Sequence, residues 1–133
     1  MAAHNEIGRL GEAIVSRSLV SRGYEILARN YRKKFGEIDI VARETAGIVH
    51  FVEVKAVSYE TRDALEWAVS HETWRPEEMV HHHKQTRLSR TIEVWLAEHP
   101  ELVEYQIDIA TVRIVPREKY ARIKIFKNIV FEP

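Results

Sequence analysis

The spacing of apolar positions along the chain predicts two helices. Residues 5–22 carry apolar side chains at helical spacing, with Asn5 suited to the N-cap and Gly23 to the position after the last turn. Residues 76–99 predict a second helix, which Pro100 ends. The buried stripe of this second helix is expected to comprise Val80, Leu88, Ile92, Trp95 and Leu96.

Alternating apolar and polar positions predict strands in much of the remaining chain. The predicted strands are residues 24–28, the two strands of a hairpin within residues 35–57, residues 104–115 and residues 121–131. Residues 57–77 lack clear periodicity, although residues 63–69 are long enough for one or two helical turns. We expect Trp67 and Trp74 to anchor this segment to the body of the domain. The resulting order α-β-β-β-α-β-β indicates an α/β fold.

The first strand of the hairpin carries acids where a purely structural strand would carry apolar or neutral residues. Side chains alternate across a strand with period two, so Glu37 and Asp39 are expected on one face. Ile38 and Ile40 are then expected on the opposite face. In the second strand the same alternation predicts one face with Phe51, Glu53 and Lys55 and another with Val52 and Val54.

The pairing of the two strands brings their acids together. A turn centred near Ala46 sets Asp39 opposite Glu53, and Gly47 suits a position of positive φ near the tip. Directly opposed residues have Cβ atoms about 4.5–5.5 Å apart, and like charges there are destabilising. A divalent cation is the most economical explanation for two opposed carboxylates next to Lys55.

The length of the chain, 133 residues, predicts a single domain that spans residues 1–133. No apolar run approaches the roughly 20 residues of a membrane span, and the first residues lack the apolar stretch of a signal peptide. We therefore expect no membrane partner. The chain has no cysteine, which excludes disulfides and thiolate metal sites and fits a reducing, cytoplasmic compartment.

The whole-chain charge gives no indication of a nucleic-acid partner, because 20 basic residues balance 20 acidic ones. The distribution of the charges is more informative. Residues 37–78 hold ten acidic and four basic side chains, and both flanks have a basic excess. This pattern suits an acidic metal pocket bordered by a phosphate-binding surface, and it equally suits solvated charge on a small domain.

Several polar residues outside the hairpin have both a functional and a structural interpretation. Glu12 lies at the border of the apolar surface of the first helix, where a surface glutamate is the commoner interpretation. Gly8 and Gly11 each cost about 1 kcal/mol in a helix interior, which indicates the close approach of another element or of a substrate. Asp108 is either an acid near the site or a residue in a solvated or strand-end position, and we favour the second.

A basic turn is predicted after the strand at residues 24–28. It combines Arg29, Arg32, Lys33 and Lys34 with Tyr31, a set that suits a phosphate backbone or a stacked base. The alternative is a solvated turn.

Two polar positions in the second helix add to this candidate surface. Lys84 lies on the buried stripe with Gln85 beside it, so its amine either extends to water, which is the default, or meets a charge. The histidines at residues 81–83 diverge by about 100° each on a helix and cannot share one metal. We expect them on the surface, with one of them near a phosphate.

These residues suit phosphodiester hydrolysis with Mg²⁺ or Mn²⁺. Asp39 and Glu53 would supply carboxylate ligands, the backbone carbonyl of Val54 another, and Glu12 is a further candidate ligand. Lys55 would stabilise charge that develops on the reacting phosphate. No nucleophilic serine or cysteine site and no glycine-rich phosphate loop is evident.

Asp39 followed by Glu53-Val54-Lys55 resembles the D…(D/E)xK signature of the PD-(D/E)xK nuclease superfamily, which has a restriction-endonuclease-like fold. A denser set of motifs resembles the YraN family, small proteins classed as endonucleases by inference and similar to archaeal Holliday-junction resolvases. These motifs are Gly8-Arg9-Leu10-Gly11-Glu12, Arg29-Asn30-Tyr31-Arg32, Gly36-Glu37-Ile38-Asp39-Ile40-Val41-Ala42 and Phe51-Val52-Glu53-Val54-Lys55.

The resemblance implies a central mixed β-sheet flanked by helices, dependence on a divalent metal, and branched or otherwise structured DNA as substrate. It implies Glu12, Asp39, Glu53 and Lys55 as the catalytic set. The chain departs from the family at Val57, where a basic residue is common. It also departs in the long acidic segment that follows.

Three functional hypotheses follow. The first is a Mg²⁺-dependent DNA endonuclease, which we expect to be a homodimer because cutting both strands of a junction needs paired sites. The second is a nuclease-fold module that binds nucleic acid or a protein partner without cutting. The third, a hydrolase of small phosphate compounds, is less expected because the sequence lacks the signature of a closed pocket.

Overall fold

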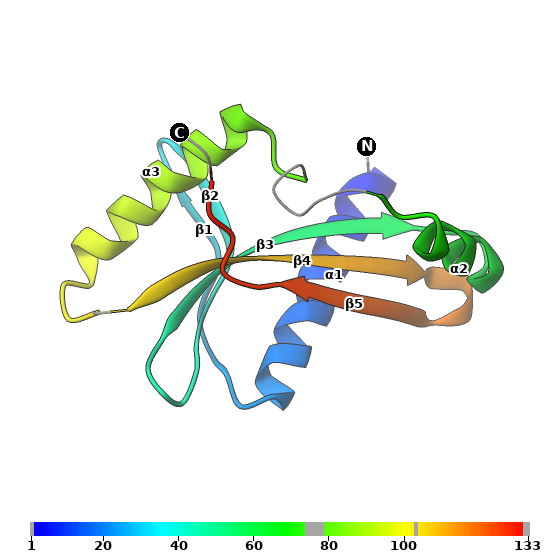
Figure 1. Ribbon diagram of the computed structural model, residues 1–133, viewed down its shortest axis with the longest axis horizontal. Helices are drawn as coiled ribbons and strands as arrows, with labels where there is room; N and C mark the ends of the chain where they lie inside the picture. The colour runs from blue at the N-terminus through cyan, green and yellow to red at the C-terminus, as the bar shows by residue number, and fades with distance from the viewer. Residues whose placement is uncertain (1, 74–78, 103, 132–133) are drawn as a thin grey trace.

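A computed structural model describes residues 2–73, 79–102 and 104–131 of the chain (Figure 1). The helices are α1 (Ala2–Ser21), α2 (Arg62–Ser70) and α3 (His82–Glu98), with a short 3₁₀ helix at Pro116–Glu118. The strands are β1 (Glu25–Lys33), β2 (Gly36–Arg43), β3 (Val49–Ser58), β4 (Tyr105–Val115) and β5 (Tyr120–Phe126). No helix in the described part of the chain is long and apolar enough to cross a membrane.

The strands form one mixed sheet in the order β1-β2-β3-β4-β5. β3 and β4 are parallel, and the other neighbouring pairs are antiparallel. The predicted α/β class and order of elements are confirmed, with α2 as an addition before α3. This arrangement is consistent with a restriction-endonuclease-like fold.

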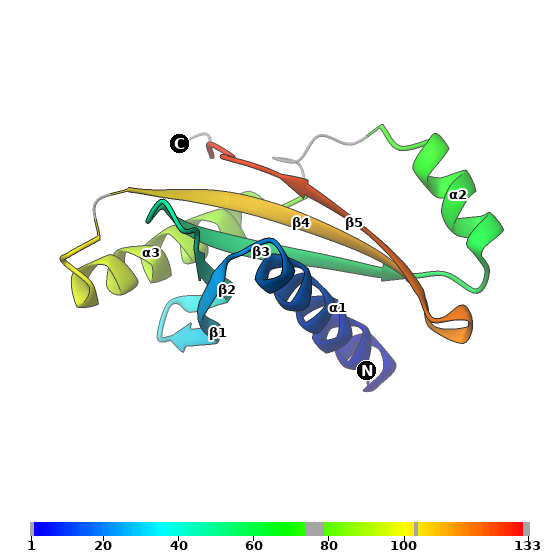
Figure 2. The same cartoon turned by 90° about the horizontal axis from the view of Figure 1, so that it is seen from below.

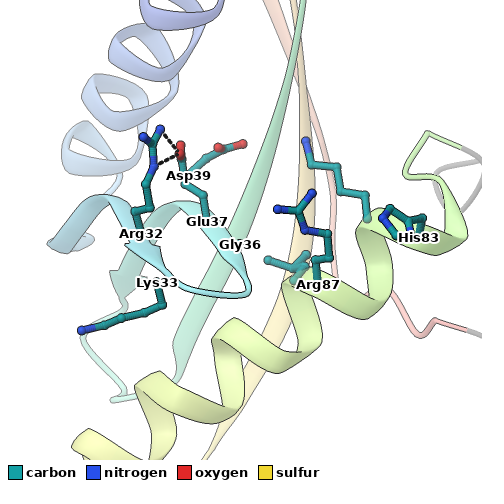
Figure 3. Close-up of a pocket in the computed structure, with 9 residues that line it drawn as sticks. Arg32, Lys33, Gly36, Glu37, Asp39, His83 and Arg87 are labelled. Atoms are coloured by element: carbon teal, nitrogen blue, oxygen red, sulfur yellow. Dashed lines mark hydrogen bonds and ion pairs between the residues drawn. The ribbon is translucent and has the colours of Figure 1, made fainter.

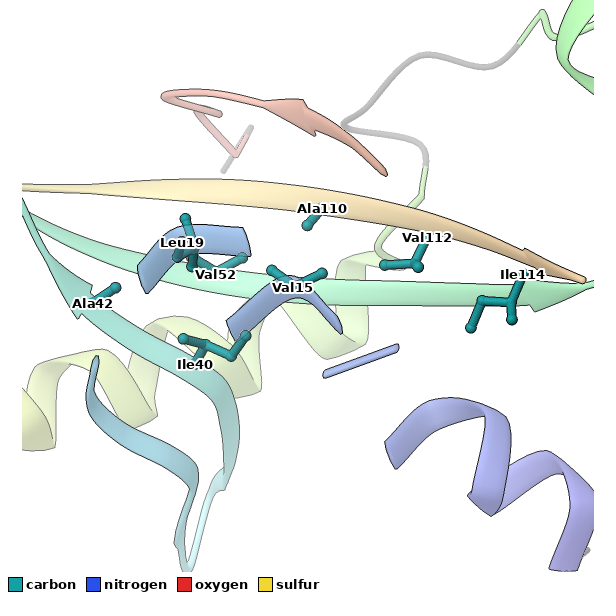
Figure 4. Close-up of a cluster of buried hydrophobic side chains, with 8 residues drawn as sticks. All are labelled: Val15, Leu19, Ile40, Ala42, Val52, Ala110, Val112 and Ile114. Atoms are coloured by element: carbon teal, nitrogen blue, oxygen red, sulfur yellow. The ribbon is translucent and has the colours of Figure 1, made fainter. Parts of the chain in front are cut away.

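Helices cover both faces of the sheet. On one face, Val15 and Leu19 of α1 pack on side chains of the central strands (Figure 4). On the other face, Leu88, Ile92 and Trp95 of α3 pack against a second cluster of strand residues. The predicted stripe is confirmed for these three residues, which are all buried, and Leu96 is partly buried. Val80 is buried but precedes the helix, because α3 begins at His82 and the described residues 79–81 are not helical. The strand residues of the α1 cluster are Ile40, Ala42, Val52, Ala110, Val112 and Ile114.

The expected shared face of Ile38 and Ile40 is wrong. Ile40 packs in the cluster under α1, whereas Ile38 packs in the cluster under α3. β2 pairs with β3 only over residues 40–43, and before Ile40 it pairs with β1 alone. Before Ile40, β2 has a neighbouring strand on one side only, so it can twist more freely there. The alternation of side chains between the two faces of the sheet therefore fails at Asp39, the residue before the pairing with β3 begins.

Several predicted boundaries also differ. α1 begins at Ala2, so Asn5 lies inside the helix and is not its N-cap. The predicted basic turn is mostly strand, because β1 runs to Lys33 and the turn is confined to residues 34–35. β5 ends at Phe126 rather than at residue 131.

The segment after β3 contains the helical turns that were expected over residues 63–69, and they form α2. Thr61 caps α2 by accepting a hydrogen bond from the Ala64 amide, so a local capping interaction begins this helix. Trp67 does not anchor the segment, because it is 64% exposed and stacks on His71. Trp74 and the predicted helix start at Pro76 lie outside the described residues.

Candidate metal and phosphate site

A cavity of about 550 Å³ lies between the β1–β2 hairpin and α3. Figure 3 shows Arg32, Glu37 and Asp39 on the hairpin side and His83 and Arg87 on the helix side. We call this cavity the cleft. The residues that line it are Arg32, Lys33, Gly36, Glu37, Asp39, His83, Lys84, Arg87 and Leu88.

The hairpin is held against α3 at its turn. Arg87 donates a hydrogen bond from Nε to the carbonyl of Phe35 at 2.9 Å. A Cβ atom at Gly36 would lie 3.2 Å from Oγ1 of Thr91, so the absence of a side chain permits this approach. The local contacts of the turn therefore fix the width of the cleft.

Asp39 lies where β2 separates from β3. The ladder pairs Ile40 with Val52, and continuing this register sets Asp39 opposite Glu53, as the turn position predicted. The amide of Val54 donates to Oδ2 of Asp39 at 2.8 Å. The carboxylate thus occupies the place of a strand partner, which fixes its orientation.

Three carboxyl groups converge beside the cleft. One oxygen each from Glu12, Glu37 and Asp39 lie within 4.8 Å of one another. Glu12 comes from α1, and its Oε1 is buried without a hydrogen-bond partner among the described residues. The sequence marked Glu37 as sharing a face with Asp39 but did not assign it to the site. The i, i+2 spacing was the signal that could have identified it.

Glu53 is nearby but lies outside this group of three. Its side chain is 1% exposed, and Oε1 lies 2.6 Å from Nζ of Lys84 on α3. Its Oε2 has no hydrogen-bond partner within the described part of the chain. The default expectation that Lys84 extends to water is therefore wrong, because burial of a carboxylate beneath it makes an ion pair the more favourable arrangement.

The electrostatics of the site reflect its excess of acid. Burial, the neighbouring Glu53 and the neighbouring Glu12 raise the pKa of Asp39 from 3.8 to about 8, against the Val54 hydrogen bond and Lys84. Burial also raises the pKa of Glu12, although a hydrogen bond from Asn30 opposes this shift. These carboxyl groups cannot all ionise without a compensating cation.

The two lysines of the site shift in opposite directions. Burial and the proximity of Lys84 lower the pKa of Lys55, which is partly exposed. Burial also opposes the charge on Lys84, but the ion pair with Glu53 outweighs it and raises the pKa of Lys84. Lys84, rather than Lys55, is therefore the direct partner of Glu53.

The candidate phosphate-binding residues of β1 and its turn differ in whether they pair with an acid. Arg29 and Lys34 are exposed, whereas Arg32 forms a 2.7 Å ion pair with Glu37 at the edge of the cleft. Tyr31 donates to Glu98 of α3, which also lies 3.3 Å from Lys33.

Two of the candidate phosphate-binding residues, Tyr31 and Gln85, make contacts within the protein. The Tyr31 ring packs on Trp95 with centroids 5.0 Å apart, so it braces β1 against α3. Gln85 donates to the Val80 carbonyl at 2.6 Å, which stabilises the start of α3. His81, His82 and His83 are exposed as expected, and His83 lines the cleft.

Asp108 occupies neither of its predicted environments. It is 3% exposed and lies 2.6 Å from Nδ1 of His50, whose Nε2 lies 2.6 Å from Glu44. His50 alternates with Glu53 along β3, so this cluster lies on the face of α1, away from the cleft. The His50 pairing holds the pKa of Asp108 below its usual value despite burial. The preference for a solvated position is wrong because a buried histidine neutralises the acid.

The donor set of the cleft fits a hard divalent cation. Mg²⁺ is bound through oxygen, often by one or two carboxylates, and keeps several waters. Oε1 of Glu12 and Oε2 of Glu53 are buried without a hydrogen-bond partner among the described residues. Burial and neighbouring acids raise the pKa of Asp39, so a cation bound beside these groups would favour its ionised form.

Fold and site together define an α/β protein with an acidic cleft bordered by basic side chains. The model described as "Uncharacterised protein family UPF0102" matches residues 11–112. The chain belongs to the UPF0102 family, which is of the YraN type.

Relatives from several bacteria carry the same family name. A UPF0102 protein of Caldicellulosiruptor bescii is 34% identical over 125 residues, covering 92% of this chain and 95% of the relative. One of Dictyoglomus turgidum is 36% identical over 86% of this chain and 87% of the relative. One of Beutenbergia cavernae is 41% identical over 84% and 86%. The similarity to these relatives therefore extends over nearly the whole fold.

Proposed function

We propose that the protein is a divalent-metal-dependent endonuclease that hydrolyses DNA phosphodiester bonds. The observation that carries this proposal is the convergence of Glu12, Glu37 and Asp39 within 4.8 Å, beside the buried Glu53, at a cleft open to solvent. The resemblance to PD-(D/E)xK nucleases and to Holliday-junction resolvases supports it, with branched or structured DNA as the expected substrate.

In this proposal Asp39 holds the metal, with Glu12 and Glu37 or Glu53 supplying further oxygens. The backbone carbonyl of Val54 is another candidate ligand, since the amide of the same residue already contacts Asp39. A bound Mg²⁺ or Mn²⁺ would supply an activated water and neutralise charge on the phosphoryl oxygen.

The basic residues have separate roles. Lys84 forms a 2.6 Å ion pair with the buried Glu53, which offsets the cost of burying that carboxylate. Lys55 is partly exposed and has no ion pair among the described residues, which leaves its ammonium available for the reacting phosphate. Arg32 and Arg87 border the same cleft and suit the neighbouring phosphates of a polyanionic substrate. Paired cutting of a junction would need a homodimer, which stays a prediction.

Cleavage of labelled DNA tests the function. We expect the protein to cut a four-way junction, a flap or a linear duplex with Mg²⁺ or Mn²⁺ and not with chelator. Asp39→Asn and Lys55→Met should each lower the rate by at least about a hundredfold, because each removes a group that acts on the reacting phosphate. Glu101→Gln and Lys127→Met are controls at exposed positions outside the cleft and should leave the rate unchanged.

A binding module is the alternative function. It would bind the same DNA, leave it uncut under every metal condition, and be insensitive to Asp39→Asn. That result would refute hydrolysis. Cleavage that survives Asp39→Asn would refute the assigned site.

A further inference from the structure

Basic side chains continue from the cleft across the sheet. Strand register sets Lys55 of β3 beside Thr111 of β4, and Thr111 beside Lys124 of β5. Two residues further along β4, Arg113 lies opposite Arg122 of β5 in the strand register. We define the basic row as Lys55, Arg113, Arg122 and Lys124. Residues that alternate with this row pack toward α1, so the row lies on the opposite face; they are Val54, Ala56, Val112, Ile123 and Ile125.

An acidic segment lies over this face. We define the acidic arm as residues 59–72, which include α2 and hold four acidic side chains and one basic side chain. Figure 2 shows α2 on the side of the sheet away from α1. Leu65 is the one buried side chain of α2. Apolar packing therefore contributes little to holding the arm, and polar contacts contribute more.

The acids of the arm pair with the basic row. A carboxylate oxygen of Glu66 lies 2.7 Å from a guanidinium nitrogen of Arg122. Glu72 lies 3.4 Å from Arg113 and 3.9 Å from Lys124. The two glutamates thus place negative charge where the row would otherwise meet an anionic partner.

These contacts are suited to exchange with a polyanion. The side chains of Arg122, Glu66 and Lys124 are 44%, 50% and 58% exposed. Arg113 and Glu72 are only 6% and 11% exposed, so Arg113 would become accessible to a partner only when the arm is released. Exposed ion pairs are individually weak and are screened by salt. Neighbouring strands lie about 4.8 Å apart, so the backbones under Lys55 and Lys124 are about 10 Å apart, the rise of about three nucleotides of a duplex strand.

We propose that the basic row is a contact for the phosphate backbone of bound nucleic acid, and that Glu66 and Glu72 occupy this contact in the free protein. Binding would replace the carboxylates of the arm by phosphates and release α2 from the sheet. The proposal rests on the proposed function, since it extends the path of a strand whose reacting phosphate lies at Lys55.

Binding of a short labelled duplex in chelator, measured by anisotropy, tests the row without cleavage. We expect Glu66→Gln/Glu72→Gln to bind about tenfold more tightly, because the ion pairs no longer compete. Glu93→Gln/Glu101→Gln is the control, with the same charge change at exposed positions outside the arm, and should change affinity by less than about twofold. Arg122→Ala and Lys124→Ala should each reduce the salt slope by about 1. Equal effects of the two double variants, or unchanged slopes, would overturn the proposal.

Hydrogen exchange of the unaltered protein provides a second test that does not depend on any variant folding. Amides of α2 should exchange faster when duplex is added. Unchanged or slower exchange there would overturn release of the arm. Arm-dependent binding without cleavage under any metal condition would refute the proposed hydrolysis and leave this inference standing. Cleavage together with binding that does not depend on the arm would refute this inference and leave the proposed hydrolysis standing.

Discussion

Asp39 is the residue on which the chemistry of the cleft depends most. It is fixed by the Val54 amide, faces other carboxyl groups and has a pKa raised to about 8. A group held in this way stores an unfavourable interaction, because ionisation brings like charges together in a partly buried place. Such a raised pKa is typical of functional sites, and here it results from burial and from the neighbouring Glu53 and Glu12.

The stability of the metal-free protein should therefore depend on pH through Asp39. Its pKa is raised from 3.8 to about 8, so between about pH 4 and pH 8 the folded state retains a proton that the unfolded chain releases. The free energy of unfolding should fall as pH rises through this window. Urea denaturation in chelator at several pH values measures it.

The matched variant for this measurement is Asp39→Asn, which keeps an acceptor for the Val54 amide but cannot ionise. It should lose the part of the pH dependence that Asp39 contributes, while Asp63→Asn on the surface of α2 should retain it. An unchanged slope in Asp39→Asn would show that another group is responsible.

The sequence could predict the opposition of Asp39 and Glu53 because hairpin register follows from the turn. It could not predict that Lys84 pairs with Glu53, because that contact depends on where α3 lies on the sheet. The contact of Asp108 with His50 was missed for a similar reason, since β3 and β4 are joined through two helices. Pairings between distant segments are set by packing rather than by local pattern.

At the scale of elements, helix spacing was the more dependable signal. The apolar stripe of α3 is where the spacing placed it, because 3.6-residue periodicity survives along a straight helix. Alternation in β2 failed where the strand leaves β3, and this irregularity opens the space that Asp39 occupies. The local rule fails at the candidate site itself, as expected where a fold departs from regularity for function.

The contact of α1 with β3 explains one of the two glycines in α1. A Cβ atom at Gly11 would lie 2.7 Å from Cβ of Ala56, whereas a Cβ atom at Gly8 would meet no described atom within 4 Å. Gly11→Ala should destabilise the protein by about 1–3 kcal/mol through overpacking. Gly8→Ala should stabilise it by up to about 1 kcal/mol through helix propensity. Thermal denaturation of both variants compares them, and equal shifts of the same sign would contradict the close approach at Gly11.

Across the whole molecule, acidic and basic side chains gather in different regions, although their total charge is zero. The chain is neutral overall, yet acids gather at the cleft and in the arm, and bases line the cleft and the far half of the sheet. Composition predicted the acidic middle segment but not that part of it folds onto the basic row. That pairing arises because β3, β4 and β5 turn their basic side chains to the face that α2 covers.

The proposed chemistry of the cleft requires a divalent cation held by the carboxylates around Asp39. In crystals soaked in Mn²⁺, the anomalous signal of the metal reports its position. We expect a peak about 2 Å from a carboxylate oxygen of Asp39, with oxygens of Glu12, Glu37 or Glu53 beside it. A peak confined to another part of the molecule, or no peak at a saturating concentration of Mn²⁺, would show that these carboxylates do not form a metal site.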